Sequence, residues 1–271
     1  MKLTVIQMGV GVDKGKNLDV MRHFVRDAAQ DGADIAILPE MFNCPYSSDY
    51  FTDFAEVAGG ESYTALSQAA SSNGIYVVGG SMPELDGDNV YNTSFVFDRS
   101  GREIARHRKV HLFDIDIKGR QRFMESETFA AGDDITVFDT EFGRMGLLIC
   151  FDIRFPEICR LTALKGANVL FVPAAFGMIT GPLHWELLFR LRAVDNQVFT
   201  VGASPARDEN GVYVSYGNSI VADPWGKVLY RANAAEEMGF VELDLNEIKQ
   251  VREQLPLINA MRNDIYSIEA I

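Results

Sequence analysis

Residues 146–157 read GLLICFDIRFPE, and both the fold and the chemistry expected of this chain start from this stretch. Its first four residues form a short apolar run of the length of a buried β-strand. Cys150 follows, and a helix can begin at Pro156, because proline suits the first turn of a helix. We expect the nearby helix terminus to favour the thiolate of Cys150, which is the reactive form. The alternative is a buried cysteine that acts as a small hydrophobic residue, as most free cysteines do.

The bulk composition is that of an ordinary globular chain. Its 271 residues allow one large α/β domain or two smaller ones. Hydrophobic residues make up 47% and charged residues 23%, and a chain of this size can bury a substantial core without disulfides. The formal net charge of −13 argues against nucleic acid and anionic membrane as partners, because both require a basic face. The basic stretch from Arg102 to Lys109 is expected to be a charged hairpin edge.

Cysteine usage and the first residues indicate a reducing compartment. Cys44, Cys150 and Cys159 are an odd, sparse set without a CxxC pair, so they do not form a disulfide framework. The chain opens directly on a strand-like segment, without a basic and then apolar leader, and no apolar run is long enough to span a bilayer. We therefore expect a cytoplasmic protein.

The spacing of apolar residues predicts alternating strands and helices in the first hundred residues. Helices are expected where apolar residues recur every three or four positions, and strands where short apolar runs end at glycine or turn residues. The predicted helices are 17–29 and 61–71, and the predicted strands are 3–8, 33–38, 75–79 and the hairpin arms 92–97 and 103–108.

Three segments of the second half repeat the first half in the same order. The matching pairs are 32–42 with 166–176, 76–81 with 199–204, and the hairpin turns 100–102 with 225–227. The alternative is that a sequence common at the start of β-strands occurs twice by chance, and three matches in one order argue against it. Two such halves predict an α/β fold, a four-layer α-β-β-α sandwich of two mixed sheets with an internal pseudo-two-fold repeat. Because no Pro-, Gly- or Ser-rich linker separates the halves, we expect residues 1–271 to form a single domain.

The two halves differ where chemistry is expected. Glu40 follows the buried strand of the first half, whereas Ala174 stands at the matching position of the second. A carboxylate beside a buried strand is partly desolvated, which raises its pKa toward the range of a general base. Lys109 follows the strand 103–108 and would add a positive charge with three donors. Because α/β sheets bind ligands at the C-terminal ends of their strands, we expect Glu40, Lys109 and Cys150 to meet there.

These groups form a coherent set for hydrolysing a carbon–nitrogen bond. Cys150 would attack a carbonyl or nitrile carbon, and Glu40 would take the thiol proton, pass it to departing ammonia and then activate water against the thioester. Lys109 and the backbone N–H of Phe151 would stabilise the oxyanion. A Cys–His dyad with His111 is the competing arrangement, but Glu40 and Lys109 already fill the required roles.

The order and spacing of these motifs resemble those of the nitrilase-like carbon–nitrogen hydrolases. The resemblance runs from the first strand to Pro256, and it implies that Glu40, Lys109 and Cys150 are catalytic. A second glutamate of the family falls on Glu125, for which the resemblance implies a role in orienting the lysine and in proton transfer. The matching motifs are LPE at 38–40, RKVHL at 108–112 and ICFDIRFPE at 149–157.

Within that family, the chain is most similar to the omega-amidase branch, which acts on the terminal amide of 2-oxoglutaramate and 2-oxosuccinamate. The deaminated-glutathione amidase branch matches less well at 195–197 and 204–205. Hydrolysis of N-carbamoyl amines is a further alternative, and an inactive sandwich scaffold is the non-enzyme alternative, against which the intact Glu-Lys-Cys set argues. The pieces that carry the branch similarity are HLFDID at 111–116, TGPLHWE at 180–186, RAVDNQ at 192–197 and ASPARD at 203–208.

Residues after the strand ends are candidates for the substrate pocket. Arg154 lies four positions after the nucleophile and would either bind a substrate carboxylate or form a structural ion pair. Tyr46, Phe176, Thr180 and His184 follow strand ends or open a helix, so they are predicted to line the pocket. Packing beneath the rim of the site is the alternative for these residues, especially for Phe176.

The expected partner is therefore a small amide that bears a carboxylate. No metal is expected, because no pair of cysteines or histidines has a ligand spacing. No nucleotide cofactor is expected either, because no GxGxxG follows a strand. The family resemblance also implies a homodimer that pairs through residues 156–165 and 184–195.

Overall fold

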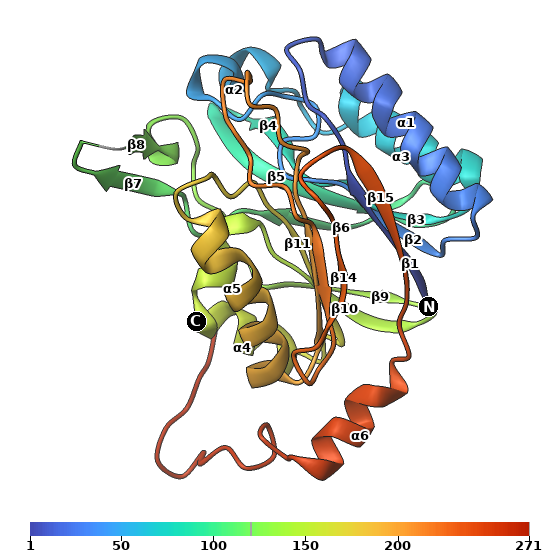
Figure 1. The fold of residues 1–271 in the computed structure, drawn as a ribbon, viewed down its shortest axis with the longest axis vertical. Helices are drawn as coiled ribbons and strands as arrows, with labels where there is room; N and C mark the ends of the chain where they lie inside the picture. The colour runs from blue at the N-terminus through green and yellow to red at the C-terminus, as the bar shows by residue number, and fades with distance from the viewer. Residues whose placement is uncertain (120, 271) are drawn as a thin grey trace.

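Two β-sheets lie face to face at the centre of the molecule, and helices cover their outer faces (Figure 1). The structure is a computed structural model and describes residues 1–119 and 121–270. The seven-stranded sheet contains β1 (Lys2–Gln7), β2 (Ile35–Ile37), β3 (Tyr76–Val78), β4 (Met82–Asp86), β5 (Asn89–Phe97), β6 (Glu103–Arg108) and β15 (Glu237–Glu242). The six-stranded sheet contains β9 (Thr136–Thr140), β10 (Gly143–Leu147), β11 (Val169–Pro173), β12 (Phe199–Ala203), β13 (Ile220–Ala222) and β14 (Val228–Arg231).

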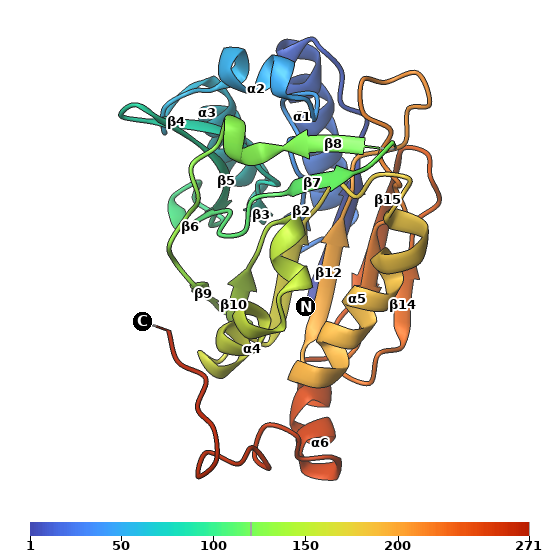
Figure 2. The same ribbon diagram turned by 90° about the vertical axis from the view of Figure 1, so that its left-hand side faces the viewer.

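Three layers of apolar side chains lie between the four layers of helices and sheets. Between the sheets, Val5 and Ile37 belong to the same buried cluster as Leu147 and Phe171. A second cluster lies between the seven-stranded sheet and its helices, and a third lies between the six-stranded sheet and its helices. The turned view shows the same layers of helices and sheets from the side (Figure 2). This confirms the predicted α-β-β-α sandwich. The helices of the outer layers are α1 (Lys14–Gln30) and α3 (Glu61–Asn73) on one side, and α4 (Pro156–Leu164) and α5 (Gly181–Asn196) on the other.

The strand order repeats in the two sheets, as the sequence predicted. Strands β1, β2 and β3 run parallel, β5 lies antiparallel to β3, and β6 pairs with β5. Strands β10, β11 and β12 run parallel in the same way, followed by antiparallel β13 and β14. The segments aligned in the sequence fall on β2 and β11, on β3 and β12, and on the two hairpin turns. Each half therefore places its strand ends at the same edge of its own sheet.

Several element boundaries differ from the prediction. Helix α1 begins at Lys14 rather than at position 17, because Asp13 accepts a hydrogen bond from the backbone N–H of Lys16 and caps the helix. Strand β10 ends at Leu147, two residues earlier than predicted. The pattern did not predict the short helix α2, the C-terminal helix α6 or the hairpin arms β7 and β8. These elements are α2 (Ser48–Phe54), α6 (Asn246–Gln254), β7 (Asp114–Ile117) and β8 (Gln121–Met124).

Gly80 shows how closely the strand ends approach one another near the predicted site. Its φ of 60° lies in the left-handed region, and a Cβ added to it would lie 2.1 Å from the carbonyl oxygen of Pro39. Only glycine fits there without strain. The backbone after β3 therefore packs directly against the turn that carries Glu40.

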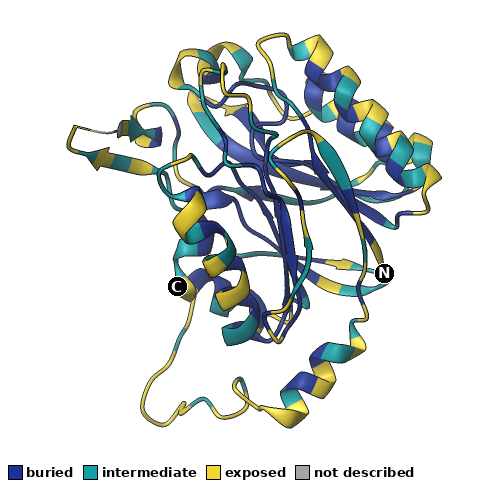
Figure 3. Ribbon diagram, in the orientation of Figure 1, coloured by how far each residue is buried: buried dark blue, intermediate teal, exposed yellow. Residues whose placement is uncertain are grey.

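Exposed apolar side chains occur on helix α5 and on the chain after α6. One face of α5 is open to solvent, and the chain after α6 runs over the outside of the molecule (Figure 3). Leu183, Leu187 and Leu191, four positions apart along α5, are 71%, 61% and 45% exposed. Within the described ranges, no helix combines the length and apolar character needed to cross a bilayer.

Candidate active site

Glu40, Lys109 and Cys150 meet in the interior, as the sequence predicted. Glu40 follows β2, Lys109 follows β6, and Cys150 comes three residues after β10. Glu40 and Lys109 have no exposed surface, and Cys150 is 4% exposed. The Nζ of Lys109 lies 2.9 Å from Oε1 of Glu40, and the Glu40 carboxylate is within hydrogen-bonding reach of the Cys150 thiol. Glu40 thus lies beside both the cation and the thiol.

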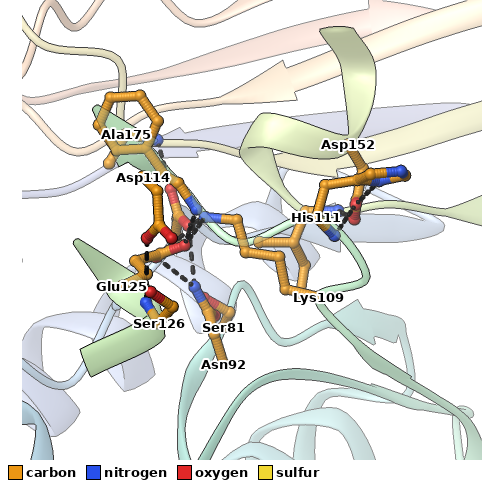
Figure 4. Close-up of polar contacts among 12 residues, drawn as sticks. Ser81, Asn92, Lys109, His111, Asp114, Glu125, Ser126, Asp152 and Ala175 are labelled. Atoms are coloured by element: carbon orange, nitrogen blue, oxygen red, sulfur yellow. Dashed lines mark hydrogen bonds and ion pairs between the residues drawn. The ribbon is translucent and has the colours of Figure 1, made fainter. Parts of the chain in front are cut away.

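Glu125 completes this cluster from the short 3₁₀ helix that follows β8 (Figure 4). Its carboxylate accepts from Lys109 Nζ, with nitrogen–oxygen distances of 3.0 Å to Oε1 and 2.9 Å to Oε2. The backbone N–H of Phe113 donates to Oε2 at 2.6 Å, and the hydroxyl of Tyr46 donates to Oε1 at 2.8 Å. Lys109 is therefore held between two carboxylates, and this geometry is compatible with the orienting role expected of Glu125.

Glu40 is held on its other sides by two further donors. Asn92 Nδ2 lies 2.9 Å from Oε1, and the backbone N–H of Ala175 donates to Oε2 at 2.8 Å. Met41, the next residue, has a φ of 55°, in the left-handed region that non-glycine residues rarely adopt. The carboxylate is fixed by its hydrogen bonds and by a strained turn behind it.

The protonation states follow from burial and from the neighbouring charges. Burial raises the pKa of Glu40, Lys109 opposes that rise, and Glu125 adds to it, so the pKa stays above its ordinary value of 4.5. Burial lowers the pKa of Lys109, but the charges of Glu125 and Glu40 raise it well above its ordinary value. Lys109 is therefore an ammonium whose positive charge is fixed.

The expectation that a helix terminus favours the thiolate of Cys150 was wrong. Burial raises the pKa of the thiol well above its ordinary value, the charge of Glu40 raises it further, and Lys109 only partly offsets these effects. Helix α4 begins at Pro156, as predicted, but a separate 3₁₀ helix, Cys150–Arg154, lies between it and the strand. Cys150 is consequently a neutral thiol that needs Glu40 as its base.

The backbone at Cys150 is strained. Its φ of 44° lies in the left-handed region, which is uncommon outside glycine and typical of functional turns. Cys150 is the first residue of its 3₁₀ helix, and Phe151 is the second. The first N–H groups of a helix lack partners within that helix, so the Phe151 N–H lies where the oxyanion role predicted for it would require.

The predicted pocket residues gather beside Cys150. A cavity of about 10 Å³ is lined by Cys150, Arg154, Phe176 and Thr180, among others. The Arg154 guanidinium lies 4.5 Å from the centre of the Phe176 ring, and its Nη1 is 3.0 Å from Nδ1 of His184. Within the described residues, no Asp or Glu forms an ion pair with Arg154. Its guanidinium therefore adjoins the cavity without a carboxylate partner.

Tyr46 lies on another side of the cluster. With Glu40, Tyr213 and other residues it lines a second cavity, of about 40 Å³. Its ring packs 4.8 Å from that of Tyr213, centre to centre, and burial holds the pKa of both phenols well above the ordinary value. Both tyrosines are therefore hydrogen-bond donors at neutral pH. Phe176 both lines the pocket and packs edge-on against Trp185, so it combines the pocket role and the packing role.

His111 does not act as a partner of the thiol. Its Nδ1 and its backbone N–H both bond to Asp152, and its ring stacks on Phe155 with ring centres 3.7 Å apart. The competing Cys–His dyad is not formed.

Sequence reasoning missed Asn92, Ala175, Tyr213 and Asp152. Asn92 reaches Glu40 because the backbone of Lys109 pairs with it across the β5–β6 edge, where Lys109 N–H donates to the Asn92 carbonyl at 2.9 Å. A one-residue shift in that register would turn the amide away. In the sequence, Asn92 stands out only as an asparagine inside an apolar strand, and this does not identify Glu40 as its partner.

The similarity to known proteins extends over nearly the whole chain. The family model for carbon-nitrogen hydrolase matches residues 2–253. The omega-amidase NIT2 of Danio rerio is 46% identical, over 100% of this chain and 98% of that protein. The omega-amidase NIT2 of Homo sapiens is 45% identical, over 99% of this chain and 97% of that protein.

Solved structures agree with this similarity. Saccharomyces cerevisiae Nit3, a member of branch 10 of the nitrilase superfamily, is 41% identical with a TM-score of 0.89, and the match covers 97% of this chain and 96% of that one. An amidase from Nesterenkonia sp. AN1, solved as a mutant with glutamine in place of a glutamate, is 25% identical with a TM-score of 0.76, covering 96% of this chain and 100% of that one. In that amidase, acrylamide has added to the active-site cysteine.

Proposed function

The chain belongs to the carbon-nitrogen hydrolase family, and we propose that it is an omega-amidase that hydrolyses the terminal amide of small dicarboxylic acid monoamides such as 2-oxoglutaramate and 2-oxosuccinamate. Family membership makes it an amide-hydrolysing enzyme. The observation that carries the choice of substrate is the guanidinium of Arg154 beside Cys150, which has no carboxylate partner within the described ranges. A substrate with a carboxylate at the end opposite its amide would supply that partner and place the amide at the thiol.

The first half of the reaction forms a thioester. Glu40 takes the proton of the Cys150 thiol, and the sulfur attacks the amide carbon. The negative oxygen that forms is stabilised by a donor of Lys109 Nζ and by the N–H of Phe151. Glu40 then passes its proton to the nitrogen, the carbon–nitrogen bond breaks, and ammonia leaves. The neutral thiol at rest explains why a carboxylate with a raised pKa stands beside it.

The second half regenerates the enzyme with the same groups. Glu40, now ionised again, removes a proton from water, and the hydroxide attacks the thioester carbon. Lys109 and the Phe151 N–H stabilise the second oxyanion, and the thiolate leaves and regains the proton from Glu40. Glu125 keeps Lys109 in place through both halves and, with Glu40, maintains its positive charge.

Steady-state rates on a panel of amides test the substrate. The panel contains 2-oxoglutaramate, 2-oxosuccinamate, deaminated glutathione, an N-carbamoyl amine and a simple nitrile. We expect the highest kcat/KM for the first two. A clear preference for one of the last three would reject the omega-amidase proposal and leave the thioester chemistry standing.

We also propose that two copies pair through α4 and α5, the helices that the family resemblance implies. The support is the row of exposed leucines on α5, Leu183, Leu187 and Leu191, together with Leu164 of α4, which is 42% exposed. Apolar rows of this kind mark protein interfaces.

Two broader proposals concern the chain as a whole. We propose that residues 1–271 form one domain, since a single buried cluster takes side chains from both sheets. We also propose a cytoplasmic location, supported by the three buried free cysteines, which suit a reducing compartment.

A further inference from the structure

Asp152 is a fully buried carboxylate two residues after the nucleophile. Four donors converge on it. Its Oδ2 accepts from the backbone N–H of Ile149 and from Nε2 of His107, each at 3.0 Å. Its Oδ1 accepts from the backbone N–H of His111 at 2.9 Å and from Nδ1 of the same histidine at 2.8 Å. Both oxygens are therefore fully used.

The donors come from the two segments that carry the reacting groups. Ile149 immediately precedes Cys150, so its N–H belongs to the nucleophile turn. His107 and His111 lie two residues before and two residues after Lys109. Figure 4 shows the bonded Asp152–His111 pair beside the Lys109 side chain. One carboxylate thus joins the turn of the thiol to both ends of the segment that carries the ammonium.

The charge of Asp152 makes these bonds strong. Burial raises its pKa, but the hydrogen bonds from His107, His111 and Ile149 outweigh burial and hold the pKa well below the ordinary value. The group is thus ionised at neutral pH, and charge-assisted hydrogen bonds are about twice as strong as neutral ones.

The strained backbone at Cys150 needs surrounding bonds to hold it, and Asp152 provides one of them. A non-glycine residue in the left-handed region is costly and persists only where its surroundings fix it. The bond from Ile149 N–H to Asp152 fixes the residue just before that strained position. His107 is itself held at its other ring nitrogen by Thr136 Oγ1, 3.0 Å away.

We infer that Asp152 is a positioning residue that sets the thiol of Cys150 against the ammonium of Lys109. It touches neither the substrate nor the reacting atoms, and it acts through the backbone of Ile149 and His111. The inference rests on the proposed function for the roles of Cys150 and Lys109. It requires an ionised carboxylate, since an amide in the same place would turn its NH₂ toward one of two backbone N–H groups, neither of which can accept.

The test compares Asp152→Asn with Asp223→Asn. Asp223 is a matched control, because it is also buried and accepts from two backbone N–H groups, those of Trp225 and Lys227 at 2.9 Å each, but in the β13–β14 turn. For each variant, kcat and KM on 2-oxoglutaramate are measured, with the thermal midpoint. The rate at which iodoacetamide alkylates Cys150 is followed separately by peptide mass spectrometry.

We expect Asp152→Asn to lower kcat and the alkylation rate on the order of 10- to 100-fold, because misplacement of a reacting group by about 1 Å has effects of that size. KM should change less than kcat. Asp223→Asn should lose comparable thermal stability but keep both rates. Wild-type rates in Asp152→Asn, or equal losses in the two variants, would overturn the inference.

A second pair of variants keeps the test decisive if Asp152→Asn does not fold. His111→Ala keeps the backbone bond and removes the ring bond, and His107→Gln keeps one side-chain donor. Each should lower the alkylation rate, and the double variant should lower it further; an unchanged double variant would contradict the role. Alkylation needs no substrate, so a wrong substrate assignment would alter the amidase assay and leave this comparison intact.

Discussion

The ammonium of Lys109 lies 2.9 Å from Oε1 of Glu40, although neither side chain has any exposed surface. Burying two opposite charges carries a desolvation penalty that their attraction often fails to exceed. A pair of apolar residues of the same volume would serve the fold as well. The pair is therefore explained by the chemistry proposed for the site, in which the carboxylate moves protons and the ammonium meets an oxyanion.

The nucleophile is tested by Cys150→Ala. We expect release of ammonia from 2-oxoglutaramate to fall by about 10⁴-fold or more, as when the nucleophile of a hydrolase is removed. The thermal midpoint should change little, because only a sulfur atom is lost. Cys159→Ala, which removes another buried cysteine, should retain turnover. Substantial activity in Cys150→Ala would refute the thioester route.

Lys109→Met should destabilise the protein strongly. It leaves the Glu40 and Glu125 carboxylates buried without their shared cation, which costs about 3–5 kcal/mol. The loss should shrink as the pH is lowered and one carboxylate takes up a proton. Urea unfolding at several pH values measures this. The control is Lys249→Met, which breaks an exposed pair with Glu253 and should change the unfolding free energy by less than about 1 kcal/mol.

The pH dependence of kcat/KM should reflect the raised pKa of Glu40. The carboxylate must be ionised to accept the thiol proton, so activity is lost as the pH falls through its pKa. Since burial raises that pKa above 4.5, the acid limb should have its midpoint above pH 4.5. A stopped assay that quantifies ammonia across the acid and neutral range records the limb. A midpoint at or below 4.5 would mean that Glu40 is not the titrating base.

Arg154→Leu should separate binding of the carboxylate from the chemistry. We expect KM for 2-oxoglutaramate to rise about 10- to 100-fold, the range of a lost hydrogen bond to a charged group. The rate on a neutral amide of similar size should change little, since it has no carboxylate to bind. Equal losses on both substrates would identify Arg154 as a structural residue.

Leu187→Glu tests the proposed pairing through α5. A buried charge at the centre of an apolar interface is costly, so the variant should elute as a monomer while the wild type elutes as a dimer. Light scattering after size-exclusion chromatography gives both masses. Val12→Glu is the control, because Val12 is equally exposed, at 62%, but lies before α1. A wild-type protein that is monomeric at micromolar concentration would contradict the pairing.

The sequence predicted the fold and the three central residues because both depend on local patterns. Glu40, Lys109 and Cys150 each follow an apolar strand, and parallel strands bring their ends to one edge. Asn92 and Asp152 could not be predicted in this way, because their partners are set by strand register and by the path of a turn. The expected effect of the helix terminus on the Cys150 thiol failed for a similar reason. A motif shows which groups are adjacent in sequence, but the pKa of Cys150 depends on how completely the folded chain excludes water.

The hydrogen bond from the Ala175 N–H to Glu40 has a consequence for folding order. It joins the end of β11 to the end of β2, two positions 135 residues apart, in opposite halves of the internal repeat. Either half alone would hold an incomplete set of reacting groups. The first half has Glu40 and Lys109, and the second has Cys150. Hydrolysis therefore cannot begin until the halves have docked. The onset of catalysis during refolding should mark the moment when the two sheets close on each other.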